Sequence, residues 1–315
     1  MTYGARITGL GDYRPATVVS NEDLAKVVET SDEWIRTRVG IANRRKAGAD
    51  ETVVSMATAA GAKAIADAGV DPTEIDLVLV ATCSLLATMP HAAPSVATAL
   101  GIPSPGAVDI NAACAGFCYS LSFAADAVRA GTARNVLVIG AEKLTDITNW
   151  DDRNTCILFG DGAGAALVGR TDDGSEGIGP VVMGSAGEFS EFITMNDKLQ
   201  MVMAGQSVYR WATGALPAVV REILDRTGID ANGLDGLVLH QANLRIIDSV
   251  VRTLGIGPDV AIGRDIVESG NTSAASIPLA LTTLRASGEV ASGDRLLLLG
   301  FGGGLSYAGQ VITCP

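Results

Sequence analysis

The chain has 315 residues, of which 48% are hydrophobic and 4% aromatic, with 37 glycines and a formal net charge of −12. This length supports one large domain or two ordinary ones, and the apolar content suits an α/β interior rich in alanine, valine and glycine. The negative charge argues against nonspecific nucleic-acid binding. The sequence shows neither a run of about 18 apolar residues nor a signal-peptide pattern, so we expect a cytoplasmic protein that does not span a membrane.

The cysteines and histidines argue against a metal centre. Five cysteines, none in repeated CxxC spacing, are typical of a reduced cytoplasmic protein with free thiols. The two histidines, His91 and His240, do not stand at a metal-ligand spacing from a further histidine or a cysteine pair. We therefore predict no metal site.

The first half of the chain alternates alanine-rich helical segments with continuous apolar runs. Runs of that kind indicate strands covered on both faces. The predicted helices cover 51–69, 93–101 and 116–131. The predicted strands cover 75–84, 106–111, 135–142 and 162–170.

The second half repeats this order after a segment without periodicity, 171–205, which we interpret as a connector and pocket loop. The predicted helices cover 215–228, 244–255 and 274–288. The predicted strands cover 234–243, 260–266, 294–302 and 306–313.

The spacings of the two halves agree and indicate a duplication. Asp76 precedes Cys114 by 38 residues, and Asp235 precedes Asn271 by 36. This correspondence pairs Asn271 with Cys114 and divides the chain into halves 1–170 and 171–315. Alternating helices and buried strands predict a mainly parallel sheet in each half, with ligands beyond the carboxyl ends of the strands.

Three polar residues follow predicted strands at those ends: Cys114, His240 and Asn271. A thiol at a helix start meets unpaired N–H groups and the positive end of the helix dipole, which favour the reactive thiolate. Each residue also has a plainer interpretation, namely a buried structural cysteine, a structural histidine and a helix-capping asparagine. Cys118, one turn further, is expected to pack in the core. Only the combination favours a nucleophilic site.

The order and content of several motifs resemble β-ketoacyl-acyl carrier protein synthase III over essentially the whole chain. The motifs are TSDEWIRTRVGI (30–41), AACAGF (112–117), FGDGAGAA (159–166), MAG (203–205), HQANLRI (240–246), GNTSAAS (270–276) and FGGG (301–304). The resemblance implies the thiolase fold, with two similar five-stranded mixed sheets in α/β/α/β/α layers, and a homodimer.

The resemblance also implies a two-stage Claisen condensation. Cys114 takes an acyl group from acyl-CoA, with backbone N–H groups of Cys114 and Gly303 as oxyanion hole. Malonyl-acyl carrier protein then loses CO₂ while His240 and Asn271 donate hydrogen bonds to the developing oxyanion. Acyl-CoA is a substrate, so no cofactor is expected.

The residues that would hold the substrates follow from the same resemblance. Trp34 and Arg153 would sandwich adenine. The rest of the CoA and pantetheine channel would be formed by Thr30, Arg38, Gln206, Asn243 and Phe301, of which Gln206 departs from the family's usual asparagine. The acidic carrier protein would dock on Arg210, Arg245 and Arg252. Met89 would reach the partner subunit's primer pocket and limit primer size.

Alternative functions are a priming ketosynthase or acyltransferase paralogue of a polyketide pathway, a thioester hydrolase, and a non-catalytic subunit of a synthase complex. The presence of His240 and Asn271 favours condensation over simple acyl transfer. The presence of Cys114 argues against a non-catalytic subunit.

Overall fold

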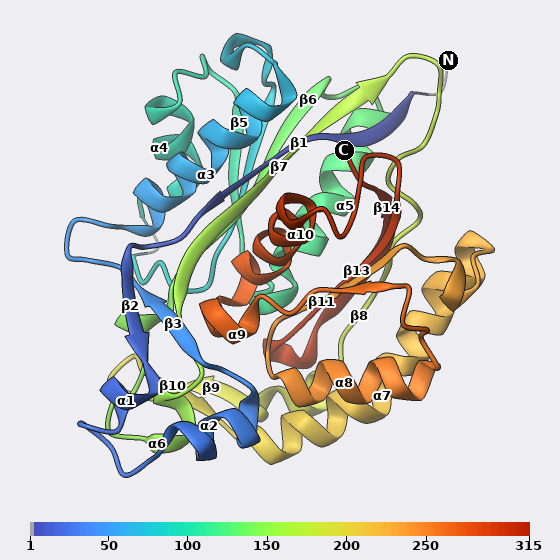
Figure 1. Ribbon diagram of the computed structural model, residues 1–315. Helices are drawn as coiled ribbons and strands as arrows, with labels where there is room; N and C mark the ends of the chain where they lie inside the picture. Colours follow the sequence, from blue (N-terminus) through green and yellow to red (C-terminus); the bar gives the residue numbers. More distant parts are fainter. Residues whose placement is uncertain (1–2, 88) are drawn as a thin grey trace.

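The structure is a computed structural model that describes residues 3–87 and 89–315. Its framework is a pair of five-stranded mixed sheets (Figure 1). The first has the strand order β1 (Gly4–Tyr13), β7 (Asp161–Thr171), β6 (Asn135–Lys143), β4 (Leu77–Ala81), β5 (Gly106–Ile110). The second has the order β12 (Ala261–Ile262), β11 (Gly236–Leu239), β13 (Arg295–Phe301), β14 (Tyr307–Thr313), β8 (Val182–Gly184).

Helices cover both sheets and fill the space between them, which gives five layers (Figure 1). The outer face of the first sheet carries α3 (Val53–Ala68) and α4 (Ala92–Ala99). Between the sheets lie α5 (Gly116–Arg129) and α10 (Ser276–Ser287). The outer face of the second sheet carries α7 (Gly205–Thr227) and α8 (Leu244–Leu254). The predicted duplicated α/β architecture is confirmed.

A smaller group of elements gathers at one end of the molecule (Figure 1). It consists of β2 (Thr17–Ser20), α1 (Asn21–Leu24), α2 (Asp32–Val39), β3 (Asn43–Lys46), α6 (Arg153–Cys156), β9 (Ile193–Met195) and β10 (Met201–Met203). Buried Arg44 of β3 holds elements of this group together. Its guanidinium donates to the Val19 and Ile157 carbonyls and to the Asn21 side chain.

Three expectations about the elements were wrong. The alternation of helices and strands predicted mainly parallel sheets, whereas each sheet is mixed, as the family resemblance implied, because β1 pairs antiparallel with β7 and β14 with β8. The segment 171–205 contributes β8 to the second sheet instead of serving only as connector. Helix α7 begins at Gly205, ten residues before the predicted start at 215. β1 was not predicted, because its glycines interrupt the apolar run.

The duplication is visible in the hydrogen bonds of the two halves. The Asp76 carboxylate accepts the Asn135 N–H at the start of β6, and the Asp235 carboxylate accepts the Arg295 N–H at the start of β13. Each aspartate therefore anchors the neighbouring parallel strand of its own sheet. Asp76 and Asp235 are therefore equivalent positions of the two halves.

The register of the duplication differs from the predicted one. Two short 3₁₀ turns, η2 (Ala113–Ala115) and η6 (Ser273–Ala275), open with residues in the left-handed region, Ala113 at φ 46° and Ser273 at φ 47°. Asn111 Oδ1 accepts the Ala113 N–H, and Asn271 Oδ1 accepts the Ser273 N–H. Asn271 therefore corresponds to Asn111, and Cys114 to the Ala274 position. With this pairing Asp76 precedes Asn111 by 35 residues and Asp235 precedes Asn271 by 36, which agree more closely than the predicted 38 and 36.

Each of the two turns packs between the sheets against a glycine in a strand of the opposite half. A Cβ on Gly140 of β6 would lie 2.3 Å from the Ala274 carbonyl oxygen, and one on Gly300 of β13 would lie 2.9 Å from the Ala115 Cα. Each half thus presses its turn against the central glycine of the other half's sheet. Among the described helices, every one is too short or too polar to span a membrane.

We predict that Gly140→Ala lowers the free energy of unfolding by roughly 1–3 kcal/mol, because the methyl group forces η6 away from β6. Gly214→Ala is the matched control, since Gly214 is exposed within α7 and has open space at its Cβ position. It should raise the same free energy by about 0.5–1 kcal/mol through helix propensity. Urea unfolding followed by circular dichroism measures both changes. An unchanged midpoint for Gly140→Ala would contradict the close crossing.

Candidate active site

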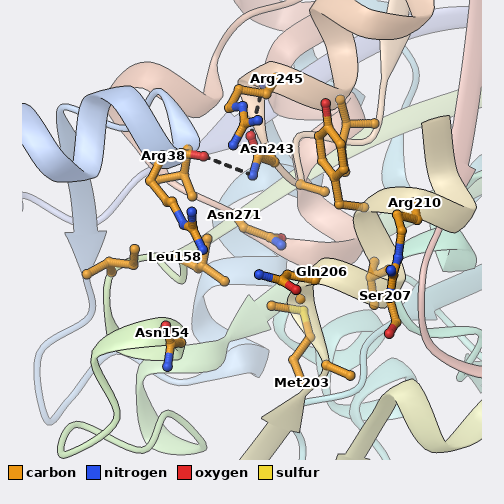
Figure 2. A pocket seen from close by; sticks show the side chains of 18 of the residues that line it. Arg38, Asn154, Leu158, Met203, Gln206, Ser207, Arg210, Asn243, Arg245 and Asn271 are labelled. Carbon is orange, nitrogen blue, oxygen red and sulfur yellow. Dashed lines mark hydrogen bonds between the residues drawn. The ribbon is translucent and has the colours of Figure 1, made fainter.

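A cavity of about 710 Å³ opens where α2, α7 and α8 meet, and Figure 2 shows the side chains that line it. Many of the residues predicted to bind substrate lie on its wall. They are Trp34, Arg38, Gln206, Arg210, Asn243, Arg245 and Asn271. These seven come from four separate stretches of the sequence, so the fold brings together what the motifs kept apart.

The predicted adenine-binding pair, Trp34 and Arg153, is in direct contact. The Arg153 guanidinium carbon lies 4.8 Å from the centroid of the Trp34 ring, and its Nη1 donates to the Glu29 carbonyl at 3.1 Å. Arg38 lies beside the same ring at 5.8 Å. A ring stacked on both sides would separate the outer planes by about 7 Å. A base can therefore enter between Trp34 and Arg153 only after Arg153 moves.

Asn243 caps the N-terminus of α8 at the wall of the cavity. Its Oδ1 accepts the Arg245 N–H at 2.9 Å, and its Nδ2 donates to the Arg38 carbonyl at 3.4 Å (Figure 2). Gln206 faces Asn243 and Asn271 across the cavity (Figure 2). Thr30 lies just before α2, and its buried hydroxyl makes no hydrogen bond within the described residues.

The predicted docking arginines divide into two groups. Arg210 and Arg245 line the cavity, and the Arg245 guanidinium lies 5.1 Å from the Tyr209 ring centroid. Arg252 is exposed two turns further along α8 and does not line the cavity. Met89 also lies outside the cavity, with 83% of its surface exposed.

Cys114 occupies η2, immediately before α5, as the strand-to-helix prediction required. The glycine loop 302–304 packs directly against it. A Cβ on Gly302 would lie 2.7 Å from the Cys114 Cβ and 3.0 Å from its Sγ, and one on Gly303 would lie 3.2 Å from the Ala113 Cβ. The absence of side chains on this loop is what lets its backbone approach the thiol.

Asn271 is fixed on both its backbone and its side chain. Its backbone N–H donates to Leu158 and its carbonyl accepts from Gly160, which holds it against the segment between α6 and β7. Its Oδ1 accepts the Ser273 N–H at 2.9 Å, so its amide nitrogen is left for the cavity. The capping interpretation and the functional one are thus compatible.

His240 follows β11 and is 2% exposed. Its Nδ1 lies 2.7 Å from the Ser276 hydroxyl, and its ring packs edge-on against Phe301 at 5.2 Å between centroids. Burial lowers the pKa of His240 to about 3. The imidazole is therefore neutral at physiological pH.

Ser273 links the cysteine to the asparagine. Its backbone N–H donates to Asn271 Oδ1, while its hydroxyl lies 3.5 Å from the Cys83 Sγ and acts to lower the pKa of the Cys114 thiol. Ser273 and Ser276 were not predicted as site residues, because only Asn271 was singled out in the 270–276 segment. Neither η6 nor α10 has a side-chain cap hydrogen bond, and two serines buried in an apolar context were the available signal.

A buried carboxylate, Glu142 at the end of β6, was also missed. It accepts hydrogen bonds from the Thr82 hydroxyl, the Cys83 N–H and the Ser84 N–H, and it has no exposed surface. Burial raises the pKa of Glu142, and its charge in turn raises the pKa of Cys114. These bonds hold the segment after β4 against the end of β6.

The prediction that the helix start favours the thiolate of Cys114 was wrong, because burial has the larger effect on the pKa of this thiol. Burial raises the pKa of the Cys114 thiol to about 12. Hydrogen bonds from Ser273 and from the Cys114 backbone oppose this rise without overcoming it. The enclosed thiol is therefore protonated at neutral pH, and only a small fraction is reactive.

Comparison with known proteins gives a consistent result. Two family models match the chain, 3-oxoacyl-[acyl-carrier-protein] synthase III at residues 108–187 and its C-terminal counterpart at 224–314. The chain is 54% identical to β-ketoacyl-[acyl-carrier-protein] synthase III 2 of Streptomyces avermitilis, with 99% of each chain covered. It is 52% identical to β-ketoacyl-[acyl-carrier-protein] synthase III 4 of Streptomyces coelicolor, with 100% of each covered.

A solved structure shows the same likeness in three dimensions. The priming β-ketosynthase of a polyketide biosynthetic pathway superimposes with a TM-score of 0.97 at 44% identity, covering 100% of this chain and 97% of the other.

The raised pKa of Cys114 predicts a steep pH dependence of its alkylation. Between pH about 6 and about 9 the rate with iodoacetamide should rise about tenfold per pH unit without a plateau, because the thiolate fraction grows tenfold per unit below a pKa near 12. Peptide mass spectrometry measures the rate at Cys114 itself. The Cys114→Ala protein gives the background from Cys83, the other partly exposed cysteine. A plateau below pH about 8 would show a far lower pKa.

Proposed function

The chain belongs to the β-ketoacyl-acyl carrier protein synthase III family, and we propose that it condenses an acyl-CoA primer with malonyl-acyl carrier protein to give β-ketoacyl-acyl carrier protein, CoA and CO₂. Enzymes of this type have the thiolase fold, which this chain shares. The observation that carries the proposal is the convergence of three groups on one turn. The segment 271–276 contains Asn271, packs against the turn η2 that carries Cys114, and bonds His240 through Ser276.

The first stage is acyl transfer to the enzyme. The Cys114 thiolate attacks the thioester carbon of acyl-CoA, a new C–S bond forms, and CoA leaves as its thiolate. Backbone N–H groups of Cys114 and Gly303 donate to the oxyanion of the tetrahedral intermediate. The close packing of the 302–304 glycines on Cys114 supports this assignment.

The second stage forms the carbon–carbon bond. Malonyl-acyl carrier protein loses CO₂, and the electron pair of the broken C–C bond forms an enolate whose oxygen accepts hydrogen bonds from His240 Nε2–H and Asn271 Nδ2–H. The enolate carbon then attacks the acyl-Cys114 carbonyl and displaces the thiolate. A neutral His240 suits this role, since it carries no positive charge that would hold the departing carboxylate.

The cavity suits the two pantetheine-bearing substrates. Trp34 and Arg153 would bind the CoA adenine, and Thr30, Arg38, Gln206, Asn243 and Phe301 would line the path to Cys114. The acidic carrier protein would dock on Arg210, Arg245 and Arg252, which give this acidic chain a local positive face. We place the reaction in the cytoplasm and predict no cofactor.

We also propose a homodimer. The edge strand β5 has a neighbour on one side only within the described sheet, and exposed apolar side chains include Val108 on this strand and Phe123 on α5. Met89, whose surface is also largely exposed, would then reach the partner subunit's primer pocket. Its flexible thioether would leave room for primers of more than one shape.

A second candidate is the same chemistry in another pathway, as a priming ketosynthase of polyketide synthesis. The 44% identity and TM-score of 0.97 to a priming β-ketosynthase favour it. The two functions differ in the carrier protein that supplies the malonyl group. A thioester hydrolase is disfavoured, because hydrolysis has no use for the donors of Asn271 and His240.

The two stages should separate by substitution. With acyl-CoA and malonyl-acyl carrier protein, Cys114→Ala should give no β-ketoacyl product. Asn271→Ala and His240→Ala should still form acyl-Cys114 but condense at least about a hundredfold more slowly, because each removes an oxyanion donor. Intact-protein mass reports acylation, and product mass reports condensation. Condensation by Cys114→Ala, or free acid without malonyl consumption, would refute the proposal.

The docking face should affect only the second stage. Arg252→Glu should raise the KM for malonyl-acyl carrier protein about tenfold at low salt, and less at high salt, because it removes an attractive charge. Acylation by acyl-CoA should stay unchanged, since Arg252 lies outside the cavity. Arg134→Glu is the control, as Arg134 is exposed beside β6 of the first sheet, whereas Arg252 lies on the helix that covers the outer face of the second. Equal effects of both substitutions would point to net charge rather than docking.

A further inference from the structure

The hydroxyl of Ser276 is the hydrogen-bond partner of the His240 ring. Both residues are buried, with exposures of 0% and 2%, and the Nδ1···Oγ distance is 2.7 Å. The same Ser276 oxygen accepts the backbone N–H of Gln241 at 3.3 Å. These are the only hydrogen bonds that the Ser276 hydroxyl makes within residues 3–87 and 89–315.

The Gln241 N–H is held in place and cannot turn elsewhere. The Gln241 side chain donates to the Leu239 and Gly263 carbonyls and accepts the Ile266 N–H, and all of these groups are buried. The Gln241 side chain is thus fixed towards β12, and the neighbouring His240 N–H donates to the Leu299 carbonyl of β13, so the backbone here is anchored on both sides of β11. It presents a fixed donor to Ser276.

Counting protons then identifies the ring nitrogen of His240 that carries the proton. A hydroxyl has one proton to donate and two lone pairs that accept. If Nδ1 carried the proton, the Ser276 oxygen would accept from both Nδ1 and Gln241, and its own proton would lack an acceptor within the described chain. If Nδ1 is bare, the Ser276 proton fills it and every group is satisfied.

From this accounting we propose that Ser276 is a positioning residue that holds His240 in the tautomer with its proton on Nε2. The inference rests on the proposed function for its catalytic meaning, because Nε2–H is the donor that decarboxylation requires. Nε2 itself makes no hydrogen bond to the described residues and remains available to substrate. The opposite tautomer would turn a lone pair towards the enolate oxygen and repel it.

The chain is well suited to a direct test, because it contains only two histidines. Protein labelled with nitrogen-15 histidine gives two sets of ring signals, whose shifts distinguish the two neutral tautomers. The His91→Gln protein identifies the set that belongs to His240, since His91 is exposed on the surface before α4. We expect His240 in the wild-type protein to show the Nε2–H pattern.

Substitution of Ser276 provides the second readout. In Ser276→Ala the Nδ1–H pattern should appear, and condensation should slow by roughly tenfold to a hundredfold, as when an orienting partner of a functional histidine is lost. Acylation of Cys114 should not change. Ser276→Thr keeps the hydroxyl and should restore the Nε2–H pattern and most of the rate. Ser122→Ala, another buried serine with a local hydrogen bond, is the matched control and should alter neither.

Two results would overturn the inference: an Nδ1–H pattern in the wild-type protein, or a Ser276→Ala protein with unchanged tautomer and condensation rate. The wild-type spectrum decides the tautomer even if Ser276→Ala does not fold. An Nε2–H pattern that depends on Ser276, in a protein that does not condense, would refute the proposed function and leave the tautomer assignment standing.

Discussion

The crossing of two strained turns between the sheets is the constraint on which the site depends. Ala113 and Ser273 both adopt left-handed backbone conformations, which cost of order 1 kcal/mol or more each for residues with a side chain. Each turn is held by an asparagine of its own half and pressed against a central glycine of the opposite sheet. The close packing of each turn on a glycine of the opposite sheet thus fixes the backbone there, and the positions of Cys114 and Asn271 depend on it.

Burial decides the charge states of His240, Cys114 and Glu142. His240 is neutral, the Cys114 thiol holds its proton, and the pKa of Glu142 is raised, each because a charged form loses its solvent. The predicted docking arginines lie along the cavity wall and on α8, apart from the buried groups around Cys114 and His240. Donors fixed in a dry interior act strongly on charge that develops only during reaction.

Much of this organisation was accessible from the sequence. Long alanine-rich segments with a closing glycine predicted α3 and its end at Gly69, and continuous apolar runs predicted the central strands. β1 and β8 were not predicted, because glycines interrupt the apolar run of β1 and β8 is only three residues long. Within the site, Cys114, His240 and Asn271 were found as polar residues at strand ends. Ser276 could not be found in this way, because its partner is 36 positions away and only the sheet packing brings the two together.

The stacked pair of Trp34 and Arg153 bears on how tightly a nucleotide can be held. A base that enters this slot gains contact with the indole but displaces a guanidinium that already occupies it. Its net gain is the difference between two stacking interactions of similar strength rather than the whole of one. An exchange of this kind gives selectivity for a flat aromatic group without great affinity. A carrier protein that brings only pantetheine, with no base, would enter the same cavity and leave the contact between Trp34 and Arg153 undisturbed.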